Sequence, residues 1–138
     1  MTTGSVTSYS GKPLYQKLGL KPGMTCLAIA APDHYPALIA DAEGVSVVTE
    51  ADKAEVVHLF CRKARDLAAM AGAALSHVAK GGTLWVSWPK KSSPLFEDLT
   101  EDGLRDVLLP LGWVDVKVCA VDKDWSGMKF LKRRPKTG

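Results

Sequence analysis

The chain has 138 residues, 46% hydrophobic and 24% charged, which is the composition of one ordinary globular domain with a single core. Two domains of half this length would each lack the apolar residues for a stable core. The net charge of +3 arises in the last ten residues, which hold five of the 18 basic residues and no acid, so the other 13 face 15 acidic residues. A general nucleic-acid surface is not implied, and we do not expect nucleic acid as a partner.

The two ends of the chain are predicted to lie outside the folded domain. Residues 1–12 have neither the charged start nor the apolar stretch of a signal peptide, and we expect a flexible arm. Residues 133–138 form a basic tail, which leaves residues 13–132 as a single domain. No apolar run approaches the roughly 18 residues that a membrane span needs. We therefore expect a cytoplasmic protein with no membrane contact.

The cysteines are odd in number, far apart and each embedded in an apolar run: Cys26, Cys61 and Cys119. This pattern is typical of buried free thiols in a cytosolic protein rather than of a disulfide framework. Only Cys61, which Arg62 and Lys63 follow, has basic neighbours of the kind that activate a thiol.

The first predicted elements are a short helix and a buried strand. Pro13 suits a first helical position and Gly19 a helix end, so the pattern predicts a helix over residues 13–18. The nearly continuous apolar run 24–30 predicts a strand that is covered on both faces.

The following connection leaves the direction of two strands open. Asp33 is a candidate cap for a helix over about residues 34–41, and residues 45–48 and 56–61 are predicted strands. The linker 49–55 is shorter than the usual helical crossover of a dozen or more residues. Either an extended segment keeps the two strands parallel or they form a hairpin, and we favour the parallel arrangement.

Apolar residues at helical spacing, many of them alanine, predict a helix over residues 62–79 that lies close to a sheet. Lys80 in its last turn and Gly81 beyond it are interpreted as the helix end. Residues 82–88 are the fourth strand, which Pro89 closes because proline cannot continue a central ladder.

The last third of the chain is predicted as a loop, a helix and two strands. After the polar loop 90–98, Thr100 is a candidate cap, and Leu99 and Leu104 are placed for a hydrophobic staple. The helix ends at residues 110–112.

The closing strands are residues 114–121 and 128–131, and the turn 122–127 is short enough to require an antiparallel pair. The whole pattern predicts a three-layer, Rossmann-like α/β sheet of about six strands, mostly parallel with a C-terminal antiparallel hairpin.

In such sheets, ligands bind beyond the carboxyl ends of the strands, near the point where the strand order reverses. The candidate ligand-binding residues on this predicted rim are Pro32, Asp33, Arg62, Trp88, Lys90, Lys91, Asp98, Asp122, Trp125 and Ser126.

Several of these residues have two interpretations. Trp88 and Trp125 offer flat walls for a pocket, but we favour core packing. Lys90 and Lys91 either hold an anion near the start of the following helix or belong to a solvated loop, and we favour the loop.

Asp98 and Asp122 are the acids best placed on the rim, and one of them is a candidate ion-pair partner of Lys90. Ser87 and Ser126 lack a glycine-flanked nucleophile elbow, and no catalytic residue is assigned.

The histidines, His34, His58 and His77, show no ligand spacing with one another or with cysteine, so we expect no metal site. His58, inside a strand, is interpreted as an interior histidine with satisfied hydrogen bonds.

Four short motifs resemble an uncharacterised bacterial domain-of-unknown-function family: residues 18–23, Gly81-Gly82 with Trp85, Pro89-Lys90, and residues 124–127. The resemblance runs from about Pro13 to Leu131, and that family carries no established activity. The order of elements is also similar to a shortened class I methyltransferase fold that lacks one helix-strand-helix section.

The methyltransferase resemblance implies a glycine-rich loop for S-adenosylmethionine after the first strand, and an acid such as Glu50 or Asp52 for the ribose hydroxyls. Residues 30–34 read Ala-Ala-Pro-Asp-His instead, without glycine, and Pro32 lacks an N–H donor. The cofactor is therefore unknown, with S-adenosylmethionine considered but not favoured.

The favoured hypothesis is a non-catalytic or degenerate methyltransferase-like module that binds a small ligand or a protein partner at the rim. The alternative is an S-adenosylmethionine-dependent methyltransferase, with Asp33 and Glu50 on the cofactor and Lys90 or Asp122 facing the substrate. A third hypothesis is an anion or nucleic-acid contact through Lys90, Lys91 and the basic tail. The oligomeric state, a homodimer included, is left open.

Overall fold

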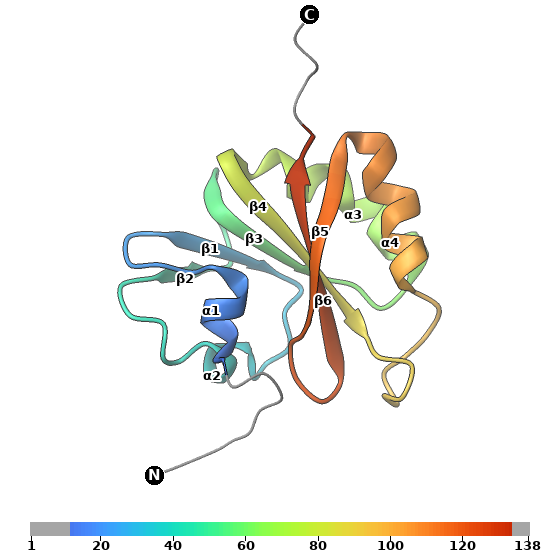
Figure 1. The fold of residues 1–138 in the computed structure, drawn as a ribbon, viewed down its shortest axis with the longest axis horizontal. Coiled ribbons are helices and arrows are strands. Elements are labelled where there is room, and N and C mark those ends of the chain that lie inside the picture. The colour runs from blue at the N-terminus through green and yellow to red at the C-terminus, as the bar shows by residue number, and fades with distance from the viewer. Residues whose placement is uncertain (1–11, 134–138) are drawn as a thin grey trace, which may run out of the picture.

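Residues 12–133 are described by the structure, a computed structural model, and they form a six-stranded sheet with helices on both faces (Figure 1). The elements are α1 (Leu14–Leu18), β1 (Thr25–Ile29), α2 (Tyr35–Leu38), β2 (Ser46–Val48), β3 (Ala54–Phe60), α3 (Ala64–Ser76), β4 (Val78–Pro89), α4 (Glu101–Leu108), the 3-10 turn η2 (Leu109–Leu111), β5 (Trp113–Ala120) and β6 (Trp125–Lys132). The strand order is β2-β1-β3-β4-β6-β5. Neighbouring strands from β2 to β4 are parallel, and the pairs β4–β6 and β6–β5 are antiparallel. The predicted α/β sheet with its C-terminal antiparallel hairpin is confirmed. The predicted arm and tail lie almost wholly outside the described residues.

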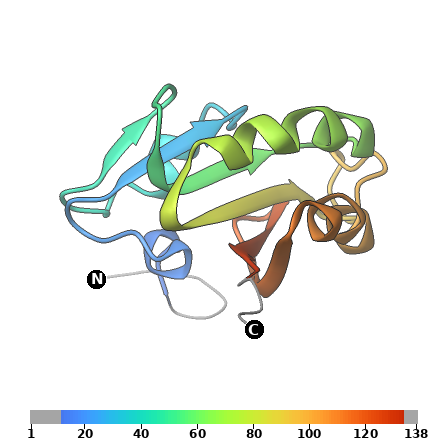
Figure 2. The same ribbon diagram turned by 90° about the horizontal axis from the view of Figure 1, so that it is seen from above.

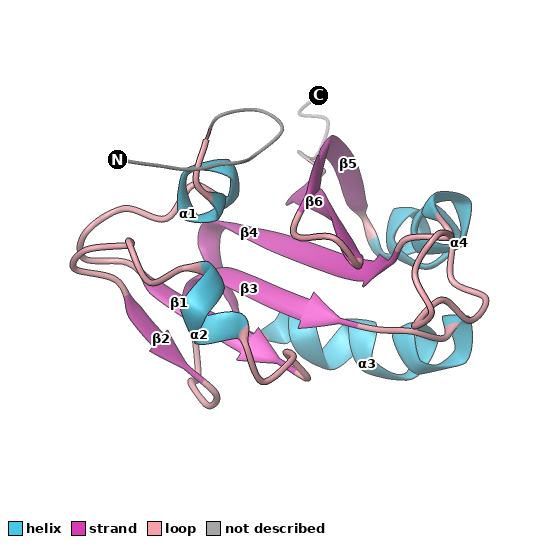
Figure 3. Ribbon diagram, turned by 90° about the horizontal axis from the view of Figure 1, so that it is seen from below, coloured by secondary structure: helices cyan, strands magenta, loops and turns pink. Residues whose placement is uncertain are grey.

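Helices α1 and α2 cover one face of the sheet, and α3 and α4 cover the other (Figures 2 and 3). On the α3 face, Leu67 and Leu104 pack with Leu84 of β4. On the opposite face, Leu18 packs with Trp85. Leu84 and Trp85 are neighbours in one strand and point to opposite faces, as the alternation of a strand requires.

Strand β1 lies between β2 and β3 and pairs with both in parallel. The favoured parallel arrangement is therefore confirmed and the hairpin is excluded. Residues 49–53 contain no helix, and Ala51 packs against the core on the α3 face, so this segment crosses β1 on that face. Because β2 and β3 lie on opposite sides of β1, the strand order reverses there, which is where sheets of this kind bind ligands.

The predicted end of the long helix is wrong. Helix α3 ends at Ser76, and Lys80 and Gly81 belong to β4, which begins at Val78. The register between β3 and β4 shifts within residues 78–83, and Gly81 has a φ of 77° in this irregularity. A helix end and a β-bulge both use glycine in the left-handed conformation, so the local signal was ambiguous.

Two further predictions of local structure are corrected. Asp33 does not cap α2, because the N-cap residue is His34 and no side chain bonds there. Strand β6 begins at Trp125 rather than at residue 128. The reason is that Asp122 Oδ1 accepts the backbone N–H groups of Asp124 and Trp125, each at 2.8 Å, and thereby closes a tighter turn.

Helix α4 begins as predicted. Thr100 Oγ1 accepts the backbone N–H of Gly103 at 3.2 Å, and Leu99 and Leu104 of the staple are both fully buried. The three cysteines are free, and Cys26 and Cys61 are buried as expected, whereas Cys119 is only partly buried. Burial raises the pKa of Cys61 to about 12, so its basic neighbours do not make it a reactive thiol.

A polar network crosses the core on the α2 face. His58 is fully buried, with Nδ1 2.9 Å from the Tyr35 hydroxyl and Nε2 2.7 Å from Ser87 Oγ, and its ring stacks on Phe60. Burial lowers the pKa of His58 to about 3, so the ring is neutral, with one nitrogen donating and the other accepting. The interior histidine predicted from the sequence is confirmed, and it ties α2, β3 and β4 together.

Two glycines form a matched test of the packing. A Cβ on Gly82 would lie 2.7 Å from the carbonyl oxygen of Glu55 and 2.9 Å from that of Ala79. Gly82→Ala should therefore lower the free energy of unfolding by about 2 kcal/mol. A Cβ on Gly72 meets nothing within 4 Å, and Gly72→Ala should raise that free energy by about 0.5–1 kcal/mol through helix propensity. Urea titrations measure both changes, and an unaffected Gly82→Ala protein would contradict the close approach at this bulge.

The buried histidine predicts a pH dependence of stability. Between pH 6.5, the ordinary pKa, and about 3, the unfolded chain binds a proton at His58 that the folded protein excludes. This contribution is complete above pH 6.5 and is lost as the pH falls, by up to about 1.4 kcal/mol per pH unit. His58→Leu removes the titration, so the difference in unfolding free energy between the native protein and the variant should shrink from pH 7 to pH 5. A constant difference in urea titrations would rule out a neutral, buried His58.

Candidate functional site

The predicted rim residues fall into separate groups. Trp88, Lys90, Lys91 and Ser126 line one cavity of about 390 Å³ beside the first turn of α4. Two carboxylates of that turn also line the cavity, so its charges are mixed.

Arg62 and Asp98 hold the start of α3. Asp98 Oδ1 accepts the backbone N–H of Ala64 at 2.8 Å, and a guanidinium nitrogen of Arg62 lies 3.3 Å from a carboxylate oxygen of Glu97. The Arg62 Nε–H also donates to the Leu95 carbonyl at 3.3 Å. These contacts fasten the loop before α4 to the N-terminus of α3.

Asp122 is engaged by the hairpin and by α2's cap residue. Its Oδ2 lies 2.7 Å from His34 Nε2, and its Oδ1 accepts the two backbone N–H groups of the turn. Partial burial raises the pKa of Asp122, but the hydrogen bonds with His34 and the two N–H groups outweigh it, so the pKa is lowered overall. Both carboxylate oxygens therefore have structural partners.

Trp88 and Trp125 do not face a common pocket. Each is 6% exposed, and they pack in the two different cores, on opposite faces of the sheet. The ring of Trp125 meets Phe60 edge-on at 5.1 Å. The favoured interpretation, core packing, is confirmed for both.

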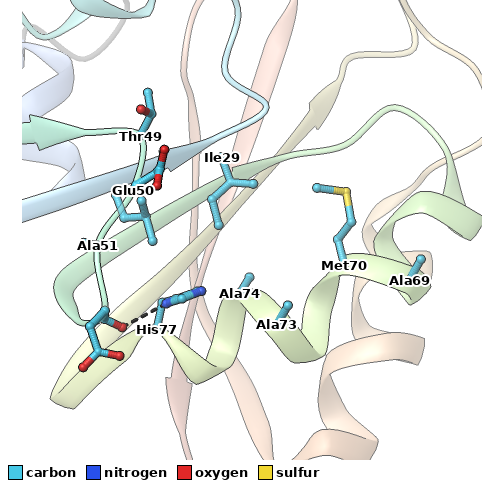
Figure 4. A pocket seen from close by; sticks show the side chains of 11 residues that line it. Ile29, Thr49, Glu50, Ala51, Ala69, Met70, Ala73, Ala74 and His77 are labelled. Carbon is cyan, nitrogen blue, oxygen red and sulfur yellow. Dashed lines mark hydrogen bonds between the residues drawn. The ribbon is translucent and has the colours of Figure 1, made fainter.

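One cavity on the α3 face was not predicted. We call it the apolar groove: a cavity of about 720 Å³ between β1, the linker from β2 to β3, and α3 (Figure 4). Ile29 from β1, Ala51 from the linker and Met70 from α3 line it, together with alanines of α3. Ile29 and Met70 project toward each other across it. The only signal in the sequence was the linker, too short to carry a helix that would cover β1 here.

Polar groups lie at the edge of the apolar groove. Glu50 and Asp52 are exposed, and neither carboxylate has a hydrogen bond or ion pair within residues 12–133. His77 Nδ1 lies 2.9 Å from the Asp52 carbonyl oxygen, which fixes that ring at one end of the groove. The groove therefore combines an apolar floor with acceptors for hydroxyl groups, within the usual size range of small-molecule sites.

A second cavity, of about 480 Å³, continues from the apolar groove over the end of β1. The two share Ile29 and Thr49, and the second is lined by the loop 30–33, which contains Pro32 and Asp33. Ala30 in this loop has a φ of 58°, which is unusual for a residue with a Cβ. Together the cavities span the point where the strand order reverses.

Within residues 12–133, no group of three or more His, Cys, Asp or Glu side chains is placed to hold a metal ion. No helix in this part of the chain has the length and apolar character to cross a membrane.

Comparison with known proteins supports the fold. No protein-family model matches the chain, and no curated protein matches it in sequence. Among solved structures, the chain is similar to a SAM-dependent methyltransferase from Aquifex aeolicus, with 17% identity and a TM-score of 0.58 over 85% of this chain and 86% of that one. It is similar to DhpI in its SAH complex, with 13% identity and a TM-score of 0.58 over 89% and 83%.

A third similar structure is magnesium protoporphyrin IX methyltransferase from Synechocystis with bound SAM, at 12% identity and a TM-score of 0.56 over 88% of this chain and 74% of that one. At these identities the similarity concerns the fold alone. The chain has a six-stranded, mostly parallel sheet with an antiparallel hairpin, of the class I methyltransferase type.

Proposed function

We propose that the protein binds S-adenosylmethionine, or its demethylated product, across the ends of β1 and β2. The observation that carries this proposal is the carboxylate of Glu50, which lies two residues after the end of β2, at the edge of the apolar groove, and has no hydrogen bond or ion pair within residues 12–133. A shared fold does not establish a shared function, so the solved methyltransferase structures only favour this ligand among those that the groove would accept.

The groove suits the adenosine half of the ligand. Glu50 would accept hydrogen bonds from two ribose hydroxyls, which are stronger to a charged acceptor than to a neutral one. Ile29, Ala51 and Met70 supply an apolar floor for a flat base. The acid expected from the methyltransferase resemblance is thus adjacent to a cavity of suitable character.

The methionine half has a poorer site. Ala30 adopts the left-handed conformation that glycine takes readily, so the loop keeps a sharp bend without glycine. Pro32 removes one backbone donor. Asp33 is exposed in the same loop and is the acid that could bind the amino group of the ligand's methionine half.

A non-catalytic module is the second candidate function, and one observation favours it. Asp122 and Lys90 were the candidates to face a substrate. Both carboxylate oxygens of Asp122 are bonded to His34 and to the hairpin turn, and Lys90 lines a cavity other than the apolar groove. Turnover is therefore the point that separates the two candidates. The S-adenosylmethionine when bound supplies the methyl group, and the chain supplies binding and orientation.

We further propose that the chain shares its motifs with the uncharacterised bacterial family that it resembles. Gly81-Gly82 and Trp85 of those motifs lie in the β4 bulge and in the core. Such a relationship would concern the scaffold rather than the site.

Calorimetric titration with S-adenosylmethionine and with its demethylated product tests the binding. Glu50→Gln keeps the shape but removes the charge, and should weaken binding about 10- to 100-fold, the equivalent of about 1.5–3 kcal/mol for a charge-assisted hydrogen bond. Glu43→Gln, also exposed but outside the groove, is the control and should bind normally. Met70→Trp should block the groove from α3.

Absence of binding at millimolar ligand would overturn the proposal. Equal affinities of Glu50→Gln and Glu43→Gln would place the ligand elsewhere. Native mass spectrometry of protein taken from cells, before dialysis, would detect a retained ligand. Binding without methyl transfer would decide for the non-catalytic module.

Ala30 predicts an unusual response to glycine. The left-handed conformation costs a residue with a Cβ about 1–2 kcal/mol, whereas glycine costs about 0.5–1 kcal/mol in unfolded-state entropy. Ala30→Gly should therefore raise the free energy of unfolding by about 0.5 kcal/mol. Ala31→Gly, at a residue without a positive φ, should lower it by about 0.5–1 kcal/mol. Thermal unfolding compares the two, and equal destabilisation would contradict the strained loop.

A further inference from the structure

A second groove lies at the N-terminal end of β4. It has a volume of about 790 Å³ and is bounded by the C-terminal end of α3, the β4 bulge and the end of β6. Four basic residues line it, and no Asp or Glu does among the described residues: Lys53, Lys80, Lys132 and Arg133. We call it the basic groove.

The cations of the basic groove have no acidic partner in the part of the chain that the structure describes. No ion pair of these four side chains occurs within residues 12–133, whereas Arg62, Lys63 and Arg105 each pair with a carboxylate. The basic groove therefore concentrates positive charge on a body that has more acids than bases outside its last ten residues.

Two hydrogen bonds hold cations of the basic groove in place. Lys53 Nζ donates to the Ser76 carbonyl at 2.6 Å, at the C-terminus of α3. The backbone N–H of Arg133 donates to the Gly112 carbonyl at 2.7 Å and fixes the chain where β6 ends. Both acceptors are uncharged carbonyl groups, so the positive charges remain available to a partner.

The floor of the basic groove is apolar. Leu75, Val78, Trp113 and Leu131 line it between the cations. Single-stranded nucleic acid matches this combination, because its phosphates pair with cations while its bases lie on apolar surface. A bilayer is flat and reaches a concave surface poorly, and a run of Asp or Glu side chains has no flat apolar groups to lie on the floor of the groove.

We propose that the basic groove binds single-stranded nucleic acid through the phosphate backbone, without base specificity. The site is independent of the proposed cofactor site, which uses other residues. The site is not visible in the sequence, because Lys53 and Lys80 lie far from Lys132 and Arg133 along the chain and come together with them only in the folded protein.

Fluorescence anisotropy with labelled single-stranded RNA and DNA of about 12 nucleotides tests the proposal on the full chain. Four phosphate contacts predict that log K falls with log salt with a slope of about −3, from about 0.7 per contact. Lys80→Ala/Lys132→Ala should weaken binding about ten-fold at low salt and reduce the slope to about −1.5. Both lysines are exposed, so thermal unfolding should remain unchanged.

Lys90→Ala/Lys91→Ala is the matched control, since it removes the same charge at the other cavity. It should bind as the native protein does. An equal loss in this control, or no binding at low salt, would overturn the proposal. Loss on deletion of residues 134–138 together with normal binding of Lys80→Ala/Lys132→Ala would assign the contact to the tail and also overturn it.

Competition identifies the class of partner. Polyglutamate and vesicles with phosphatidylserine should displace the oligonucleotide weakly. Stronger binding of either one would replace nucleic acid with an acidic peptide or a lipid surface and overturn the proposal.

Discussion

The linker from β2 to β3 must cross β1, and the rest of the site depends on this constraint. Strand β1 pairs with β2 along one edge and with β3 along the other, so the chain has only residues 49–53 in which to pass from one side to the other. An extended segment can make this crossing, but a helix cannot. The α3 face of β1 is therefore lined by a thin segment rather than by a packed helix, and the apolar groove lies beside it.

The opposite face of the same strands is packed by a second core cluster. His58 lies beside Ala28 in the sheet and joins Tyr35 to Ser87 through two short hydrogen bonds. Tyr35 follows the loop after β1 directly, so the network holds that loop against the sheet. One face thus supplies an open groove, and the other positions the loop at the end of the groove. A ligand across both cavities would meet a largely preformed site.

Charge is segregated along the linker itself. Glu50 and Asp52 lie at the apolar groove, whereas Lys53, the next residue, turns to the C-terminus of α3 and the basic groove. Residues that are neighbours in sequence therefore lie on surfaces of opposite charge. Net charge averages over such surfaces, which is why the near balance of the chain body hides both of them.

The sequence by itself determined the elements and the class of fold. Helix caps, glycine ends and apolar periodicity act between residues within about four positions, so Thr100 and the apolar run of β1 could be interpreted correctly from the chain. The expectation that a ligand binds at the carboxyl ends of the parallel strands stays a prediction. Where the same local signal serves two structures, as with Gly81, the prediction was wrong.

Only the tertiary structure decided which residues meet. Trp88 and Trp125 are separated because alternate residues of paired strands face different cores. Asp122 forms a hydrogen bond with His34, which is distant from it in sequence. The tertiary structure also brought Ile29 opposite Met70, and Lys53 to the end of β6, across large distances in sequence. The physical reason is that both grooves are spaces left between packed elements, and such spaces depend on how the elements are arranged rather than on any one segment.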